Sequence, residues 1–322
     1  MRRLFRFSLW GFASLQLYRS AITAIARRMG SKPERDYSFD ADFLWFEGGG
    51  EPLFLSRPSS DTTLIFIEGF RVMNPVGMHE EWLREFSDHH NINVAAPIIG
   101  LQSLPYDQRN REWFFQQDLR SAVQLYDAIH ASVPEGHKIV VVGASGGALA
   151  AIAIAARREP ALTILVAPPP PDPAFPRNVK PSVATAGRWF YRHMDLAATL
   201  FPFTVVRLFR TRPGQIPKKA GKGADNIVRG VETNVGQLAE MQRALRWSGA
   251  TLQRLKSRNI MLLWGSEDET VEPEALRVLA QSLTAANNTI QAVEVPGVGH
   301  RVLLGDDGAP ARRSILDALA RL

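Results

Sequence analysis

The sequence predicts an α/β fold: a doubly wound, mostly parallel sheet with helices on both faces and a helical cap insertion. Three features predict it. Short apolar runs rich in Val, Ile and Leu alternate with longer stretches of helical spacing, as expected where crossover helices join parallel strands. The run at 139–142 is apolar without interruption, which is typical of a strand buried on both faces. A long segment, 169–258, shows no strong strand and interrupts the alternation.

The individual elements follow from these patterns in chain order. Predicted strands span 43–46 and 53–55, which form a hairpin around a Gly-rich turn, and then 62–67, 91–96, 139–142, 161–166, 259–264 and 289–295. Predicted helices span 80–86, 108–132, 148–156, 274–282 and 309–322. Four prolines at 168–171 mark the start of the insertion, because a proline run is extended and semi-rigid. The core is therefore predicted at 40–168 and 259–322, with the helical cap at 169–258.

Residues 1–33 form a third unit, which we predict to be a basic amphipathic helix. The segment has seven basic residues and no acidic one, and its uncharged run at 7–18 is shorter than the roughly 20 apolar residues that span a bilayer. One interpretation is a helix on an anionic membrane surface, on the cytoplasmic side. A second is an export signal with a small-residue cleavage site at 24–26. A third is a helix packed on the protein's own body.

Charge is distributed unevenly along the chain. The formal net charge is +6, but residues 172–258 carry +11 and residues 1–33 carry +7, which leaves −12 on the remainder. Two basic appendages on an acidic body suit an amphiphilic substrate with an anionic head group, although a solvated basic face has the same composition. The absence of Cys excludes a disulfide, a thiol nucleophile and a Cys-ligated metal. We expect no cofactor, no metal and no nucleic-acid partner, because no recognisable nucleic-acid motif accompanies the basic residues.

The turn between the strand at 139–142 and the following helix carries a single Ser in the pattern G-x-S-x-G. A Ser on so sharp a turn projects its hydroxyl away from the backbone. Gly143 and Gly147 lie two residues on either side of Ser145, where a Cβ would crowd the neighbouring backbone. The N–H of Gly146 can point at a developing oxyanion beside the positive end of the helix. The alternatives are an incidental Ser and a phosphate-binding loop, and no Lys follows the glycines to support the latter.

Two further side chains complete a candidate site. A Ser hydroxyl needs a base to become a nucleophile, and the base needs an acid that orients it. Asp268 follows one predicted strand and His300 lies in a Gly-rich turn after another. The carboxyl ends of parallel strands meet at one edge of the sheet, so Ser145, Asp268 and His300 are expected to meet there. Glu267 is the second choice for the acid.

Four stretches of this chain together resemble the α/β-hydrolase superfamily: 64–70, 143–147, 262–268 and 295–300. The resemblance implies an α/β-hydrolase fold over 40–168 and 259–322, with Ser145 as nucleophile, His300 as general base and acid, and Asp268 as its orienting partner. It also implies an oxyanion hole from the backbone N–H groups of Gly146 and Phe70, and a cap over the site as in lipase-like and monoacylglycerol-lipase-like members.

One position departs from the pattern of that superfamily. The oxyanion turn usually begins His-Gly, whereas this chain has Glu68-Gly69. A carboxylate that faced the hole would oppose the oxyanion. We therefore expect Glu68 to turn away from the hole, or to pair with Arg71 or an Arg of the cap.

Three functions are consistent with these observations. The first is a serine hydrolase that cleaves carboxylic esters, with a lipid-like ester as the expected substrate and an anionic membrane surface as a further partner. The second is an acyltransferase that uses the same triad with an acceptor other than water. The third is a non-catalytic, membrane-binding protein with a hydrolase-like fold, for which Glu68 is the best support.

Overall fold

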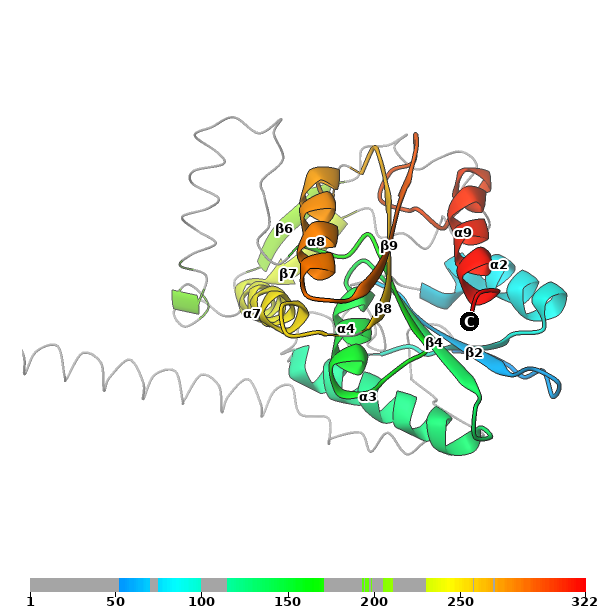
Figure 1. Cartoon of the computed structure of the whole chain (residues 1–322). Coiled ribbons are helices and arrows are strands. Elements are labelled where there is room, and N and C mark those ends of the chain that lie inside the picture. Colours follow the sequence, from blue (N-terminus) through cyan, green and yellow to red (C-terminus); the bar gives the residue numbers. More distant parts are fainter. Residues whose placement is uncertain are drawn as a thin grey trace, which may run out of the picture.

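The computed structural model describes residues 52–69, 75–99, 115–170, 193, 195–196, 198, 205–210, 230–256, 258–268 and 270–322. Its centre is a seven-stranded sheet in the order β1-β3-β2-β4-β5-β8-β9 (Figure 1). The strands are β1 (Leu53–Leu55), β2 (Thr62–Ile67), β3 (Asn93–Ala96), β4 (Lys138–Ala144), β5 (Leu162–Val166), β8 (Asn259–Gly265) and β9 (Thr289–Val295). Every neighbouring pair is parallel except β1–β3, so the predicted mostly parallel sheet is confirmed.

Helices cover both faces of the sheet, as a doubly wound topology requires. One face carries α2 (Pro75–His90) and α9 (Ala309–Leu319), the latter preceded by the short 3-10 helix η4 (Asp306–Gly308). The other face carries α3 (Phe115–Ser132), α4 (Gly147–Arg157), α7 (Val235–Leu252) and α8 (Pro273–Ala285). Alternate side chains of the central strands supply the two apolar cores, one on each face.

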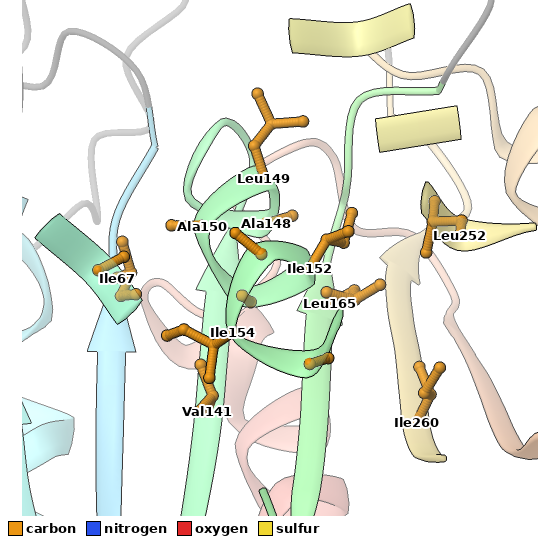
Figure 2. Packing of buried hydrophobic residues seen from close by; sticks show 14 of the residues in the cluster. Ile67, Val141, Ala148, Leu149, Ala150, Ile152, Ile154, Leu165, Leu252 and Ile260 are labelled. Carbon is orange, nitrogen blue, oxygen red and sulfur yellow. The ribbon is translucent and has the colours of Figure 1, made fainter. Parts of the chain in front are cut away.

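The helix α4 is buried along most of its length. Residues 147–155 are all buried, because the Ala side chains let the helix approach the sheet closely while Ile152 and Ile154 fill the core. In Figure 2 these side chains lie against Val141 and Leu165 of the adjoining strands, with Leu252 of α7 nearby. The Ala-rich sequence thus lets α4 pack closely on the sheet, with its N-terminus at the carboxyl end of the central strand β4.

Several boundaries differ from the sequence-based expectations. The helix predicted at 80–86 extends over Pro75–His90, and the helix predicted from residue 108 is described from Phe115 onward. The strand at 53–55 pairs with β3. Its predicted hairpin partner at 43–46 lies outside the described residues, as do residues 1–33.

The inserted segment is not purely helical. It contains a two-stranded antiparallel sheet of β6 (Val205–Arg210) and β7 (Gly230–Asn234). The prediction that this segment has no strong strand is therefore wrong. Arg207 and Arg210 interrupt the apolar run of β6, which therefore lacks the unbroken signature of a buried strand. The helix α7 also differs from a cap element, because it packs on α4 and α3 and contributes to the core. Among the described residues, the core thus resumes at Ala244 within α7, before residue 258.

No helix among the described residues combines the length and the apolar character needed to cross a membrane.

A close backbone approach at the end of β8 gives a stability prediction. A Cβ added at Gly265 would lie 2.0 Å from the carbonyl oxygen of Val298, which is backbone and cannot rotate away. We expect Gly265→Ala to lower the free energy of unfolding by about 2–3 kcal/mol or more, as overpacking does. Gly299→Ala is the matched control, since its nearest contact would be an ordinary 3.7 Å. Denaturant unfolding of both variants measures the difference, and equal stabilities would contradict the packing described here.

Candidate active site

Ser145 lies on the turn between β4 and α4, as predicted. Its φ is +49°, a left-handed conformation that is strained for a residue with a side chain. The turn is held in place because the Ser145 N–H donates to the carbonyl of Val166 at the end of β5, at 2.8 Å. A Cβ at Gly147 would lie 2.1 Å from the carbonyl oxygen of Ile67. A glycine at position 147 therefore allows α4 to approach the end of β2 closely. The turn that carries the Ser145 hydroxyl lies at the carboxyl ends of the strands.

Asp268 follows β8 and is completely buried at its side chain. Its Oδ1 accepts hydrogen bonds from the backbone N–H groups of Thr270 and Val271, both at 2.8 Å. These two donors fix the orientation of the carboxylate and leave Oδ2 directed at His300. The second-choice acid, Glu267, is exposed.

His300 joins the other two residues, although their positions are distant in the sequence. Its Nδ1 lies 2.8 Å from Oδ2 of Asp268, and its Nε2 lies 3.0 Å from Oγ of Ser145. Because the carboxylate can only accept, Nδ1–H donates to it and Nε2 is left to accept the Ser hydroxyl proton. The side chain of His300 is 24% exposed, so a reacting molecule can reach it. The structure thus brings the three predicted side chains into one hydrogen-bonded chain.

The predicted oxyanion donors are only partly described. Gly146 is the N-cap of α4, where the first backbone N–H groups of a helix have no partner within the helix and the helix dipole is positive. The second predicted donor, Phe70, lies outside the described residues. What the described residues can do is stabilise a negative oxygen beside Ser145 from the α4 side.

The side chain of Glu68 contacts α2, through a partner that the sequence did not suggest. Its side chain is buried, with an exposed fraction of 10%. Its Oε1 accepts the backbone N–H of Gly69 at 2.6 Å, and its Oε2 contacts Nε2 of His79 on α2. The expected partner Arg71 lies outside the described residues. His79 was missed in the sequence because it precedes the helix expected at 80–86.

The buried carboxyl of Glu68 titrates below its ordinary range. Burial alone would raise its pKa, but the contacts with His79 and Gly69 outweigh burial and lower the pKa from 4.5. A carboxyl whose pKa is depressed by folding stabilises the protein above its unfolded pKa, and this contribution is lost as the pH falls through the folded pKa.

The stability of a Glu68→Gln variant should therefore depend on pH in a defined way. We expect the loss in free energy of unfolding, relative to wild type, to be largest near pH 7. It should shrink below about pH 4.5, as the pH falls from the unfolded pKa of Glu68 toward its lower folded pKa. Urea unfolding at several pH values measures it. Glu81→Gln removes an exposed carboxylate of α2 and serves as control. A loss that stays constant over this pH range would contradict a charged Glu68.

A sequence model described as "Alpha/beta hydrolase family" matches residues 100–312, well over half of the chain. Among solved structures, a monoacylglycerol lipase of Paleococcus ferrophilus is similar at 16% identity and a TM-score of 0.58, over 83% of this chain and 97% of the other. A soluble variant of the monoglyceride lipase of Saccharomyces cerevisiae is similar at 10% identity and a TM-score of 0.60, over 84% and 91%.

A thermophilic esterase of Thermogutta terrifontis is similar at 18% identity and a TM-score of 0.53, over 84% of this chain and 93% of the esterase. At such low identities these likenesses establish the common fold. A comparison with curated proteins gives no match.

Proposed function

The chain belongs to the alpha/beta hydrolase family, and we propose that it is a serine hydrolase that cleaves carboxylic esters through an acyl-enzyme on Ser145. The observation that carries the proposal is the hydrogen-bonded chain from Ser145 through His300 to the buried Asp268. A nucleophile, a base and an orienting acid in this order are the parts that acyl transfer requires.

The proposed reaction has two halves. In the first, Oγ of Ser145 attacks the ester carbonyl carbon while Nε2 of His300 takes the hydroxyl proton, and Asp268 stabilises the imidazolium that forms. The tetrahedral intermediate collapses as its bond to the alcohol oxygen breaks, and His300 returns the proton to that oxygen. In the second half, water attacks the acyl-enzyme by the same route and releases the acid. The N–H of Gly146, and by resemblance that of Phe70, would bind the oxyanion in both halves.

We further propose a lipid-like ester as the substrate. The support is the net charge of +11 over residues 172–258, together with the two structural neighbours named as monoacylglycerol or monoglyceride lipases. In this proposal the part of residues 169–258 that precedes α7 acts as a cap, and its basic side chains attract an anionic head group.

A panel of acyl esters tests the function. Short-chain and long-chain esters, each with a neutral and with an anionic head group, are compared for wild type and Ser145→Ala. We expect hydrolysis by the wild type alone, with the highest kcat/KM for a long-chain ester. Product analysis in the presence of an acceptor alcohol separates hydrolysis from acyl transfer, because transfer would yield a new ester in place of the free acid. Equal turnover by Ser145→Ala would contradict the proposal.

We propose a membrane-surface location on the basis of residues 1–33. If their basic side chains bind anionic lipid, the full chain should sediment with vesicles that contain phosphatidylserine, and binding should weaken as salt rises. A chain that lacks residues 1–33 should remain in the supernatant. Equal sedimentation of both chains would contradict this role of the segment.

A further inference from the structure

Three side chains and one backbone amide form a buried hydrogen-bonded chain between α2 and the end of β2. Trp82 donates its Nε1–H to Nδ1 of His79 at 2.8 Å. Nε2 of His79 contacts Oε2 of Glu68, and Oε1 of Glu68 accepts the N–H of Gly69 at 2.6 Å. His79 and Trp82 are each about 4% exposed, and their rings pack on Phe66. The chain therefore lies in the core rather than in solvent.

The chemistry of these groups fixes the direction of the chain. Indole Nε1–H can only donate, so Nδ1 of His79 must be the unprotonated nitrogen. The ring proton then lies on Nε2 and is donated to Glu68. The carboxylate of Glu68 in turn accepts from Gly69, so every donor in the chain meets an acceptor.

The Gly69 end of this hydrogen-bonded chain is adjacent to the proposed nucleophile. A Cβ added at Gly69 would lie 2.9 Å from Cβ of Ser145 and 3.4 Å from the backbone nitrogen of Gly146. The backbone carbonyl of Glu68 is equally close to α4, since a Cβ at Gly147 would lie 2.7 Å from it. A small shift of the 68–69 turn would therefore change the space in which a reacting carbonyl meets the Ser hydroxyl.

Titratable groups face Glu68 from two elements. His79 faces it from α2, and His300 and Arg301, in the turn that follows β9, interact with it electrostatically. The carboxylate thus interacts both with the helix that holds it and, electrostatically, with the residue proposed as the general base.

From this arrangement we infer that Glu68 is a positioning residue for the proposed reaction, which holds the 68–69 turn against Ser145 through the chain Trp82–His79–Glu68–Gly69. The inference rests on the proposed function and extends it to a residue that does not touch the substrate. In this role Glu68 replaces the His expected at the oxyanion turn, and α2 becomes the support of that turn. Loss of the Glu68 carboxylate should lower kcat more than it raises KM, because a misplaced turn affects the transition state more than substrate binding.

The polarity of the chain suggests a specific test. In Glu68→Gln the amide oxygen can still accept from Gly69, but the amide NH₂ then faces Nε2 of His79. Nε2 of His79 can accept a hydrogen bond from this NH₂ only if the ring proton moves from Nε2 to Nδ1. There it would face the indole N–H of Trp82. Two donors then face each other at one place in the chain. Replacing Trp82 by Phe removes one of these donors and allows the chain to form again with reversed polarity.

We therefore compare Glu68→Gln, Trp82→Phe and the double variant by steady-state ester hydrolysis. Glu68→Gln should lower kcat by about 10–100-fold with KM changed less than about threefold, and the double variant should recover at least about threefold of that loss. Trp82→Phe alone measures the cost of the smaller side chain, and Glu81→Gln, exposed on α2, controls for loss of a carboxylate. Wild-type kcat in Glu68→Gln, or a double variant no faster than Glu68→Gln, would overturn the inference.

A measurement on the wild-type protein covers the case in which these variants do not fold. Long-range ¹H–¹⁵N spectra of the histidine rings, with His79 assigned by its substitution to Gln, should show His79 as the Nε2–H tautomer. An Nδ1–H tautomer would overturn the inference. Ser145→Ala, assayed in parallel, separates the two proposals: if it retains turnover, the proposed function fails, whereas if it is inactive and Glu68→Gln is normal, only the role of Glu68 fails.

Discussion

Ser145→Ala is expected to lower kcat for ester hydrolysis by about 10⁴–10⁶-fold. The substitution removes the oxygen that forms the acyl-enzyme, and losses of this size are typical when the nucleophile of a Ser-His-Asp set is removed. It leaves the fold intact, because the backbone bond from residue 145 to Val166 does not use the hydroxyl. Steady-state assays with the best ester of the panel measure the effect.

The control for this variant is Ser282→Ala. Ser282 is an exposed Ser on α8 whose hydroxyl donates to the carbonyl of Val278 in its own helix. The kcat of Ser282→Ala should equal that of the wild type. Turnover by Ser145→Ala within a factor of ten of the wild type would show that another residue attacks the ester.

Asp268→Asn is expected to lower kcat by about 10⁴-fold with little effect on the fold. Oδ1 of Asp268 accepts the N–H groups of Thr270 and Val271, so the Asn oxygen will keep that position and its NH₂ will face His300. Nδ1 of His300 must then accept, which places the ring proton on Nε2, against the hydroxyl of Ser145. A base in this tautomer cannot take the proton, and a loss of this size follows when the orienting Asp of such a set becomes Asn.

This variant separates orientation from simple loss of charge. Asp317→Asn, an exposed position on α9, removes the same charge and should leave kcat unchanged. Thermal unfolding should place Asp268→Asn near the wild type. If Asp268→Asn turned over esters at the wild-type rate, the hydrogen bond between Asp268 and His300 would have no part in the reaction.

The strands and the candidate site could be predicted because each depends on local sequence. Buried strands of a parallel sheet are largely unbroken apolar runs, so the strand at 62–67 was predicted with its observed bounds. Ser145, Asp268 and His300 each follow the end of a strand, and the topology of the sheet then brings the ends together. Chain order and strand position were therefore sufficient to predict that these side chains would meet.

Contacts that depend on packing between distant elements were not predictable in the same way. The position of Glu68 depends on His79 of α2, which has no distinctive sequence pattern. The sequence assigns α7 to the cap because it lies between the proline run and the strand at 259–264, in a segment without a strong strand. In the structure, Ala244 and Leu245 bury α7 against the core. Sequence shows which face of a helix is apolar, but it does not show which neighbour covers that face.

The most direct test of the central claim is labelling of the folded, full-length protein with a fluorophosphonate probe, followed by peptide mass spectrometry. The probe reacts with a Ser hydroxyl only where a base and an oxyanion site activate it. We predict a single phosphonylated residue, Ser145, with labelling lost in Ser145→Ala and strongly slowed in Asp268→Asn. An unlabelled folded protein, or an adduct on another residue, would contradict the proposal that these three side chains form an active site.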